Sequence, residues 1–143
     1  SRSMANLKVL NLSGNNIGDA GIEAFSSVIA NEALWKLEKL SFESNQIGDA
    51  GIIAFAEALK PTSNFDKVVL PNLMQLNLGF NQIEDEGMMV FSIALRSNLL
   101  CKVEYPYLYV LPLLENLYVD DGVLGTEHPQ LKAACEARRI KLH

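Results

Sequence analysis

One motif occurs three times in this chain, and its fixed positions are the same in each copy. The copies begin at Leu7, Leu37 and Leu73, and each has leucine or phenylalanine at its fourth and sixth positions. Asparagine stands at the ninth position, isoleucine at the eleventh, aspartate at the thirteenth and glycine at the fifteenth. A weaker fourth copy begins at Leu114, with Gly122 in place of the asparagine. Such repetition indicates a chain built from similar structural units.

The hydrophobic period within each unit changes from two residues to about 3.6, which predicts a short Leu-x-Leu strand followed by a helix. In the helices, apolar residues recur at i, i+3 and i+7, and they are Ile22, Phe25 and Ile29, then Ile52, Phe55 and Leu59, then Met88, Phe91 and Leu95. One strand and one helix cannot bury this stripe alone. The units must therefore stack side by side with their strands parallel, which predicts an α/β fold.

Two polar positions of the motif have predicted roles at the ends of these elements. A buried asparagine after each strand can satisfy backbone groups of adjacent turns, and these residues are Asn15, Asn45 and Asn81. An aspartate stands at each helix start, and we expect it to cap the helix that it starts. These residues are Asp19, Asp49 and Asp85.

The pattern resembles the leucine-rich repeat family over nearly the whole chain, and its Asn-x-Ile-x-Asp-x-Gly variant is similar to the ribonuclease-inhibitor-like class. This resemblance implies a right-handed β-α solenoid with a parallel sheet on the concave face and helices on the convex face. We expect one domain over residues 1–143, with repeats starting near 7, 37, 73 and 114. The abundant cysteines of ribonuclease inhibitor are lacking, so inhibition of ribonuclease is not implied.

The two ends of the chain differ. Residues 120–143 contain a polar helical segment with Pro129 in its first turn and arginine in its last, and we expect this segment to be a C-terminal cap. The first repeat begins at Leu7 with no comparable cap. We therefore expect the chain to be a C-terminal piece of a longer protein, or to self-associate through its uncapped N-terminal repeat.

Composition excludes several kinds of partner. The net charge is −5 and the basic residues are scattered, which does not fit a nucleic-acid-binding protein. No apolar run approaches the length of a membrane span, and we expect no signal peptide because the first residues lack an apolar core. Cys101 and Cys135 lack metal-ligand spacing and fit a reducing compartment. These features favour a cytoplasmic protein without membrane or nucleic-acid partners.

No arrangement typical of an enzyme stands out, and we expect neither catalytic activity nor a cofactor. His128 lacks a neighbouring nucleophile and precedes Pro129, which indicates a residue at a helix start. The acidic run 84–86 could hold a cation, but three acids at a helix start more often match the helix dipole.

Side chains between the strand leucines should point to the concave surface. The candidate partner-binding residues there are Lys39, Glu43, Gln75, Asn77, Phe80, Tyr118, Asp120 and Asp121. Phe80 and Tyr118 could anchor an interface, because desolvated aromatic groups dominate binding energies. The alternative is that Phe80 folds over a repeat edge and that Tyr118 is an ordinary half-exposed strand residue.

Extra residues fall between a helix and the next strand at about 60–72 and 96–113, which a solenoid places on one edge. Tyr105 and Tyr107 in the second insertion are further candidates, since loops commonly carry function. The alternative is that these aromatic side chains only pack the longer loops against the helices.

These observations predict a non-enzymatic scaffold that binds a protein partner on its concave face or loop edge, by presenting side chains on a rigid sheet. The family resemblance offers two alternatives. Ran GTPase-activating proteins contain very similar repeats, which would make the chain a GTPase-activating regulator. Tropomodulin-like repeats cap actin filaments, although no residue here singles out that role.

Overall fold

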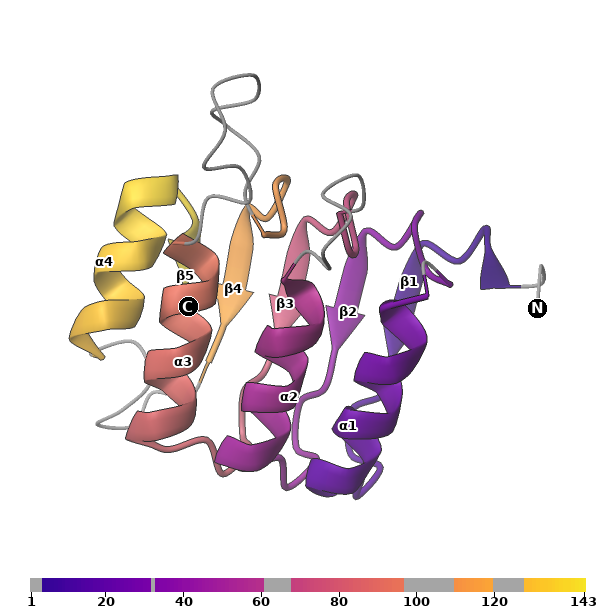
Figure 1. The fold of residues 1–143 in the computed structure, drawn as a ribbon, viewed down its shortest axis with the longest axis horizontal. Helices are drawn as coiled ribbons and strands as arrows, with labels where there is room; N and C mark the ends of the chain where they lie inside the picture. The colour runs from indigo at the N-terminus through magenta and orange to yellow at the C-terminus, as the bar shows by residue number, and fades with distance from the viewer. Residues whose placement is uncertain (1–3, 32, 61–67, 97–109, 120–127) are drawn as a thin grey trace.

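The computed structural model describes residues 4–31, 33–60, 68–96, 110–119 and 128–143. Short strands alternate with helices along the chain, and the strands form one parallel sheet in chain order. The elements are β1 (Val9–Asn11), α1 (Gly18–Ile29), β2 (Lys39–Ser41), α2 (Asp49–Leu59), β3 (Gln75–Asn77), α3 (Asp85–Arg96), β4 (Asn116–Tyr118), α4 (Pro129–Arg138) and β5 (Lys141–Leu142). Figure 1 shows the helices side by side over one face of the sheet. The predicted leucine-rich-repeat solenoid is confirmed, with the sheet on its concave face.

The sheet register follows from the motif. The central leucines of the strands align across the sheet, and they are Leu10, Leu40, Leu76, Leu117 and Leu142. Each leucine points to the helix side, where it meets the predicted helical stripes. Phenylalanines from neighbouring repeats continue this core, with ring centroids 4.9 Å apart for Phe25 and Phe42, and 6.2 Å apart for Phe42 and Phe55. The core is therefore one continuous layer between sheet and helices.

Two of the three motif asparagines, Asn45 and Asn81, link successive repeats as predicted. Asn15 is exposed, and its Nδ2 donates to carbonyl groups of its own turn. Asn45 is fully buried, and its Oδ1 accepts hydrogen bonds from the N–H groups of Asn15 (2.9 Å) and Ile17 (3.2 Å). Its Nδ2 donates to the carbonyl groups of Leu12 and Phe42. Asn81 repeats this pattern one unit further along the chain. The asparagines thus supply bonds that the three-residue strands do not reach.

The predicted capping role was wrong for Asp19 and Asp49, because α1 and α2 have no side-chain cap of their own and each carboxylate crosses to the start of the next helix. Oδ1 of Asp19, in the first turn of α1, accepts hydrogen bonds from the N–H groups of Gly48 (2.7 Å) and Gly51 (2.9 Å) at the start of α2. Oδ1 of Asp49 likewise accepts from the N–H of Glu84, just before α3. The helices lie parallel with level N-termini, so a neighbour's unpaired amides are within reach.

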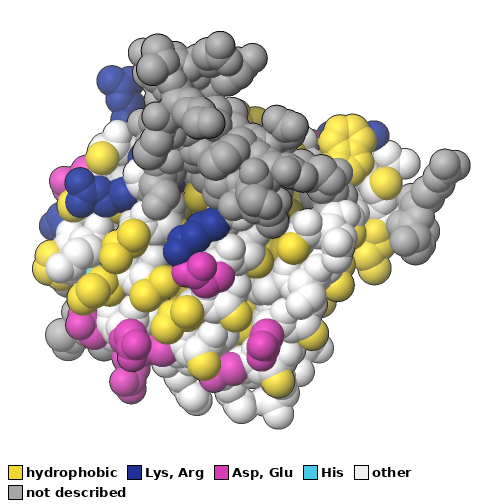
Figure 2. Space-filling view, in the orientation of Figure 1, with side chains coloured by type: hydrophobic (Ala, Val, Ile, Leu, Met, Phe, Trp, Pro, Cys, Tyr) yellow, Lys and Arg dark blue, Asp and Glu magenta, His cyan; other side chains and the backbone are white. Residues whose placement is uncertain are grey.

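This cross-repeat cap explains the glycine of the motif. A Cβ atom at Gly51 would lie 2.5 Å from Oδ1 of Asp19, and one at Gly87 would lie 2.5 Å from Oδ1 of Asp49. The aspartate of one repeat and the glycine of the next are therefore a matched pair. The acidic side chains gather on the helix face along the edge where the helices begin (Figure 2), which also suits the helix dipoles.

The first repeat is less buried than the second. Its motif residues Leu7, Leu10, Leu12 and Ile17 are only partly buried. The corresponding residues of the second repeat are at most 2% exposed, and they are Leu37, Leu40, Phe42 and Ile47. The outer edge of β1 consequently presents apolar surface.

The C-terminal segment contributes more than the expected polar helix. Arg139 adopts a left-handed conformation (φ 56°) after α4 and turns the chain into β5, which pairs with β4. The guanidinium of Arg138 also bridges two parts of the chain. Its Nη1 donates to the carbonyls of Leu95 (3.0 Å) and Val110 (2.7 Å), and its Nη2 to that of Leu111. Arg138 thus joins the end of α3 to the start of the fourth repeat.

Candidate partner-binding face

Two rows of side chains cross the concave face of the sheet. The first row, near the strand starts, contains Val9, Lys39, Gln75, Asn116 and Lys141. The second row lies two residues further along each strand and contains Asn11, Ser41, Asn77 and Tyr118, with His143 following β5. Polar groups predominate in both rows, so the face is hydrated unless a partner covers it.

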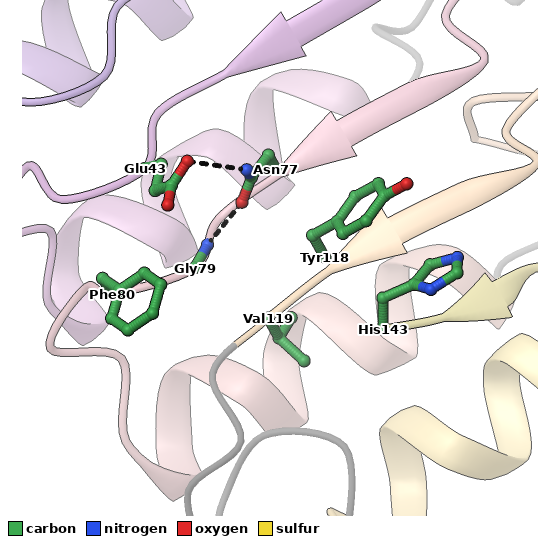
Figure 3. A pocket seen from close by; sticks show the side chains of 7 residues that line it. All are labelled: Glu43, Asn77, Gly79, Phe80, Tyr118, Val119 and His143. Atoms are coloured by element: carbon green, nitrogen blue, oxygen red, sulfur yellow. Dashed lines mark hydrogen bonds between the residues drawn. The ribbon is translucent and has the colours of Figure 1, made fainter.

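A pocket of about 270 Å³ opens at the carboxyl ends of the strands. Its lining residues are Glu43, Asn77, Gly79, Phe80, Tyr118, Val119 and His143. Figure 3 shows that they come from the ends of β3, β4 and β5 and from the turn after β2. Residues far apart in the sequence therefore converge here because the strands are parallel and their ends meet at one edge.

Phe80 is the most exposed large hydrophobic residue of the described chain, with 72% of its surface accessible. It has a left-handed backbone (φ 53°), which is unfavourable for a bulky side chain. Gly14 and Ser44 occupy the same motif position in the first two repeats and are also left-handed. The turn therefore requires a left-handed residue at this position, and in the third repeat that residue is aromatic. The expectation that Phe80 could be a surface anchor remains a prediction.

Tyr118 and His143 form the opposite wall of the pocket. Their rings stack with centroids 4.5 Å apart and planes inclined by 15°. Nε2 of His143 also lies 3.1 Å from Oδ1 of Asn116, so the imidazole is held from two sides. Sequence reasoning missed His143, because the two-residue strand before it is too short to show a period.

Glu43 lines the pocket beside Asn77 (Figure 3). Its Oε2 accepts a hydrogen bond from Nδ2 of Asn77 (3.1 Å), and Oδ1 of Asn77 accepts one from the N–H of Gly79 (2.9 Å). These bonds fix the orientation of both side chains (Figure 3). Glu43 is half-buried and forms no ion pair with any residue that the structure describes.

The structure brings together four of the predicted site residues, namely Glu43, Asn77, Phe80 and Tyr118, in this one pocket. Lys39 and Gln75 lie in the first row and do not line it. Tyr105, Tyr107, Asp120 and Asp121 lie outside the described residues, as do the central parts of both insertions.

His128 is the N-cap residue immediately before α4, at a helix start as the sequence indicated. Its Nδ1 accepts a hydrogen bond from the N–H of Leu131 (3.3 Å), and its Nε2 lies 3.0 Å from Oδ1 of Asp85. Because Nδ1 is an acceptor, the proton must be on Nε2, which donates to Asp85. His128 stands at the fifteenth motif position of the fourth copy, where the earlier copies have glycine. Its imidazole contacts the Asp85 carboxylate of the preceding repeat.

Other reactive groups are sparse in the described part of the chain. Burial of Cys135 raises the pKa of its thiol from 9.0 to about 11, so the group stays protonated near neutral pH and is a poor nucleophile. No three His, Cys, Asp or Glu side chains gather as metal ligands among residues 4–31, 33–60, 68–96, 110–119 and 128–143. Within the same ranges, none of the helices has the length and apolar character needed to cross a membrane.

Comparison with known families agrees with the repeat positions. A family model described as a Leucine Rich repeat matches three segments, residues 3–26, 36–56 and 69–92. Each match contains one complete copy of the motif from strand to helix start. No curated protein matches the chain.

Proposed function

Because the chain is a leucine-rich repeat protein, we propose that it binds a protein partner on its concave face, at the pocket formed by Glu43, Asn77, Phe80 and Tyr118. Leucine-rich repeats indicate a protein-interaction module, and we assign partner binding to this pocket. The supporting observation is Phe80, an aromatic side chain 72% exposed beside the pocket at a backbone position that disfavours it.

The mechanism is preorganisation. Glu43 and Asn77 are held by hydrogen bonds, and Tyr118 and His143 are held by stacking. Side chains that are already ordered lose little entropy when a partner binds, so more of the contact energy appears as affinity. Aromatic residues in such a setting act as hot spots once water is excluded.

Comparative capture tests this proposal. The protein, its Phe80→Gly variant and its Met89→Ser variant are immobilised, and captured proteins are identified by mass spectrometry. Met89 is an exposed control on α3, on the helix face. We expect at least one protein to be captured by the wild type and the control and to be lost with Phe80→Gly. Identical capture by all three proteins would rule out this pocket.

The GTPase-activating alternative gives a different result. A scaffold leaves the rate of GTP hydrolysis by small GTPases unchanged, whereas an activator raises it severalfold or more. We expect no change when the purified chain is added to a panel of small GTPases. A rate increase would replace the scaffold by a regulator of GTPases.

A further inference from the structure

We infer that the pocket receives the guanidinium group of an arginine carried by the protein partner. This inference rests on the proposed function and specifies the chemistry that the pocket recognises. The pocket volume of about 270 Å³ lies below the ~300 to 1,000 Å³ typical of small-molecule sites. One side chain fits such a space better than a larger ligand does.

The charge in the pocket favours a cation. Glu43 places a half-buried carboxylate there, and Asn77 is its one hydrogen-bond partner among the described residues. A carboxylate has room for about four hydrogen bonds, so most of its acceptor sites face the pocket or water. A charged donor entering the pocket would form a charge-assisted bond, which is stronger than a neutral one. The net charge of −5 adds a weak attraction in the same direction.

The aromatic groups favour arginine over lysine. Phe80 stands beside Glu43, and Tyr118 lies across the pocket from them (Figure 3). A planar guanidinium can stack on an aromatic face while its N–H groups bind a carboxylate in a fork. An ammonium group is compact and strongly hydrated, so it cannot stack on an aromatic face and bind a carboxylate in a fork at the same time.

An anionic ligand fits less well. Lys39 and Lys141 belong to the first row, near the strand starts. The pocket lies at the other ends of the strands, and neither lysine lines it. His143 is the one basic side chain among the residues that line the pocket, and its ring is stacked on Tyr118. An anion there would face the Glu43 carboxylate directly, and like charges at close range repel.

The test uses two blocked peptides, acetyl-Gly-Gly-Arg-Gly-Gly-amide and the same peptide with citrulline, the neutral isostere of arginine. Binding is followed by amide chemical shifts of the ¹⁵N-labelled protein. We expect the arginine peptide to shift the amides of Gly79, Phe80 and Tyr118. It should bind about tenfold more tightly than the citrulline peptide, as expected for a partly hydrated charge-assisted bond.

Two charge-neutralising variants localise the effect. Glu43→Gln keeps an oxygen that can accept from Asn77, so the fold should persist, and a thermal melt checks this. We expect this variant to bind the arginine and citrulline peptides equally. Glu23→Gln removes the same charge from the exposed surface of α1, and it should keep the tenfold preference.

Equal binding of the two peptides by the wild type, shifts confined to residues outside the pocket, or tighter binding of a lysine peptide would each overturn the inference. These outcomes are distinct from failure of the proposed function. A partner that is lost with Phe80→Gly but retained by Glu43→Gln would preserve the interaction module and refute arginine recognition. A partner lost with both variants, and displaced by the arginine peptide alone, would support both.

Discussion

Asn45 ties two repeats together at a single buried side chain. It accepts hydrogen bonds from the first repeat and donates to carbonyls of both repeats, whereas Nδ2 of Asn15 bonds carbonyls of its own turn. We expect Asn45→Ala to lower the free energy of unfolding by about 2 to 4 kcal/mol, because several backbone groups lose their partner. Asn15→Ala should lower it by only about 1 kcal/mol. Urea unfolding measures both, and equal losses would contradict a linking role for Asn45.

Phe80 combines an exposed ring with a strained backbone. Glycine adopts a positive φ without steric cost, so we expect Phe80→Gly to raise the free energy of unfolding by up to about 1 kcal/mol. Phe80→Ala should give no such gain, because alanine keeps the Cβ atom. Chemical denaturation of the three proteins compares them. A loss of stability in Phe80→Gly would instead mean that the ring stabilises the fold, and this would weaken its assignment to binding.

Between elements, the aspartate-to-glycine contact couples each helix to the next. We expect Asp19→Ala to lower the free energy of unfolding by about 1 to 2 kcal/mol, as for loss of a helix cap. Amide hydrogen exchange identifies the helix affected. The amides of Gly48 and Gly51 at the start of α2 should lose protection first. Earlier loss at the start of α1 would favour capping within one repeat.

The strands and helices could be predicted from the sequence because their signals are local. The alternation of Leu10 and Leu12 and the helical spacing of Ile52, Phe55 and Leu59 are visible within one unit. The target of Asp19 could not be predicted, because it depends on the lateral distance between helices. β5 has two residues, too few to show a period.

The pocket was predicted in part. The motif assigns Glu43, Asn77, Phe80 and Tyr118 to the concave side, since their positions relative to the leucines are fixed. Their convergence depends on the parallel register, which the repeat also implies. The stacked His143 depends on β5, so its place beside Tyr118 follows only from the assembled sheet.

Over the whole molecule, burial increases from the first repeat inward. Leu76 is fully buried between neighbouring repeats, whereas Leu10 is partly buried at the open edge. We expect Leu76→Ala to lower the free energy of unfolding by about 3 to 4 kcal/mol and Leu10→Ala by about 1 to 2 kcal/mol. Urea titration at two protein concentrations checks this. If Leu10→Ala lowered the free energy of unfolding as much as Leu76→Ala does, and by an amount that depends on protein concentration, a second copy would cover the open edge.

The Arg138 bridge has a consequence for the spacing of the repeats. Because one guanidinium binds the carbonyls of Leu95 and Val110, the end of α3 and the start of the fourth repeat are held close together. We therefore expect that the number of residues between Leu95 and Val110 can change while the third and fourth repeats stay packed together. The connection between α3 and β4 should therefore accept an inserted sequence without loss of the repeat packing.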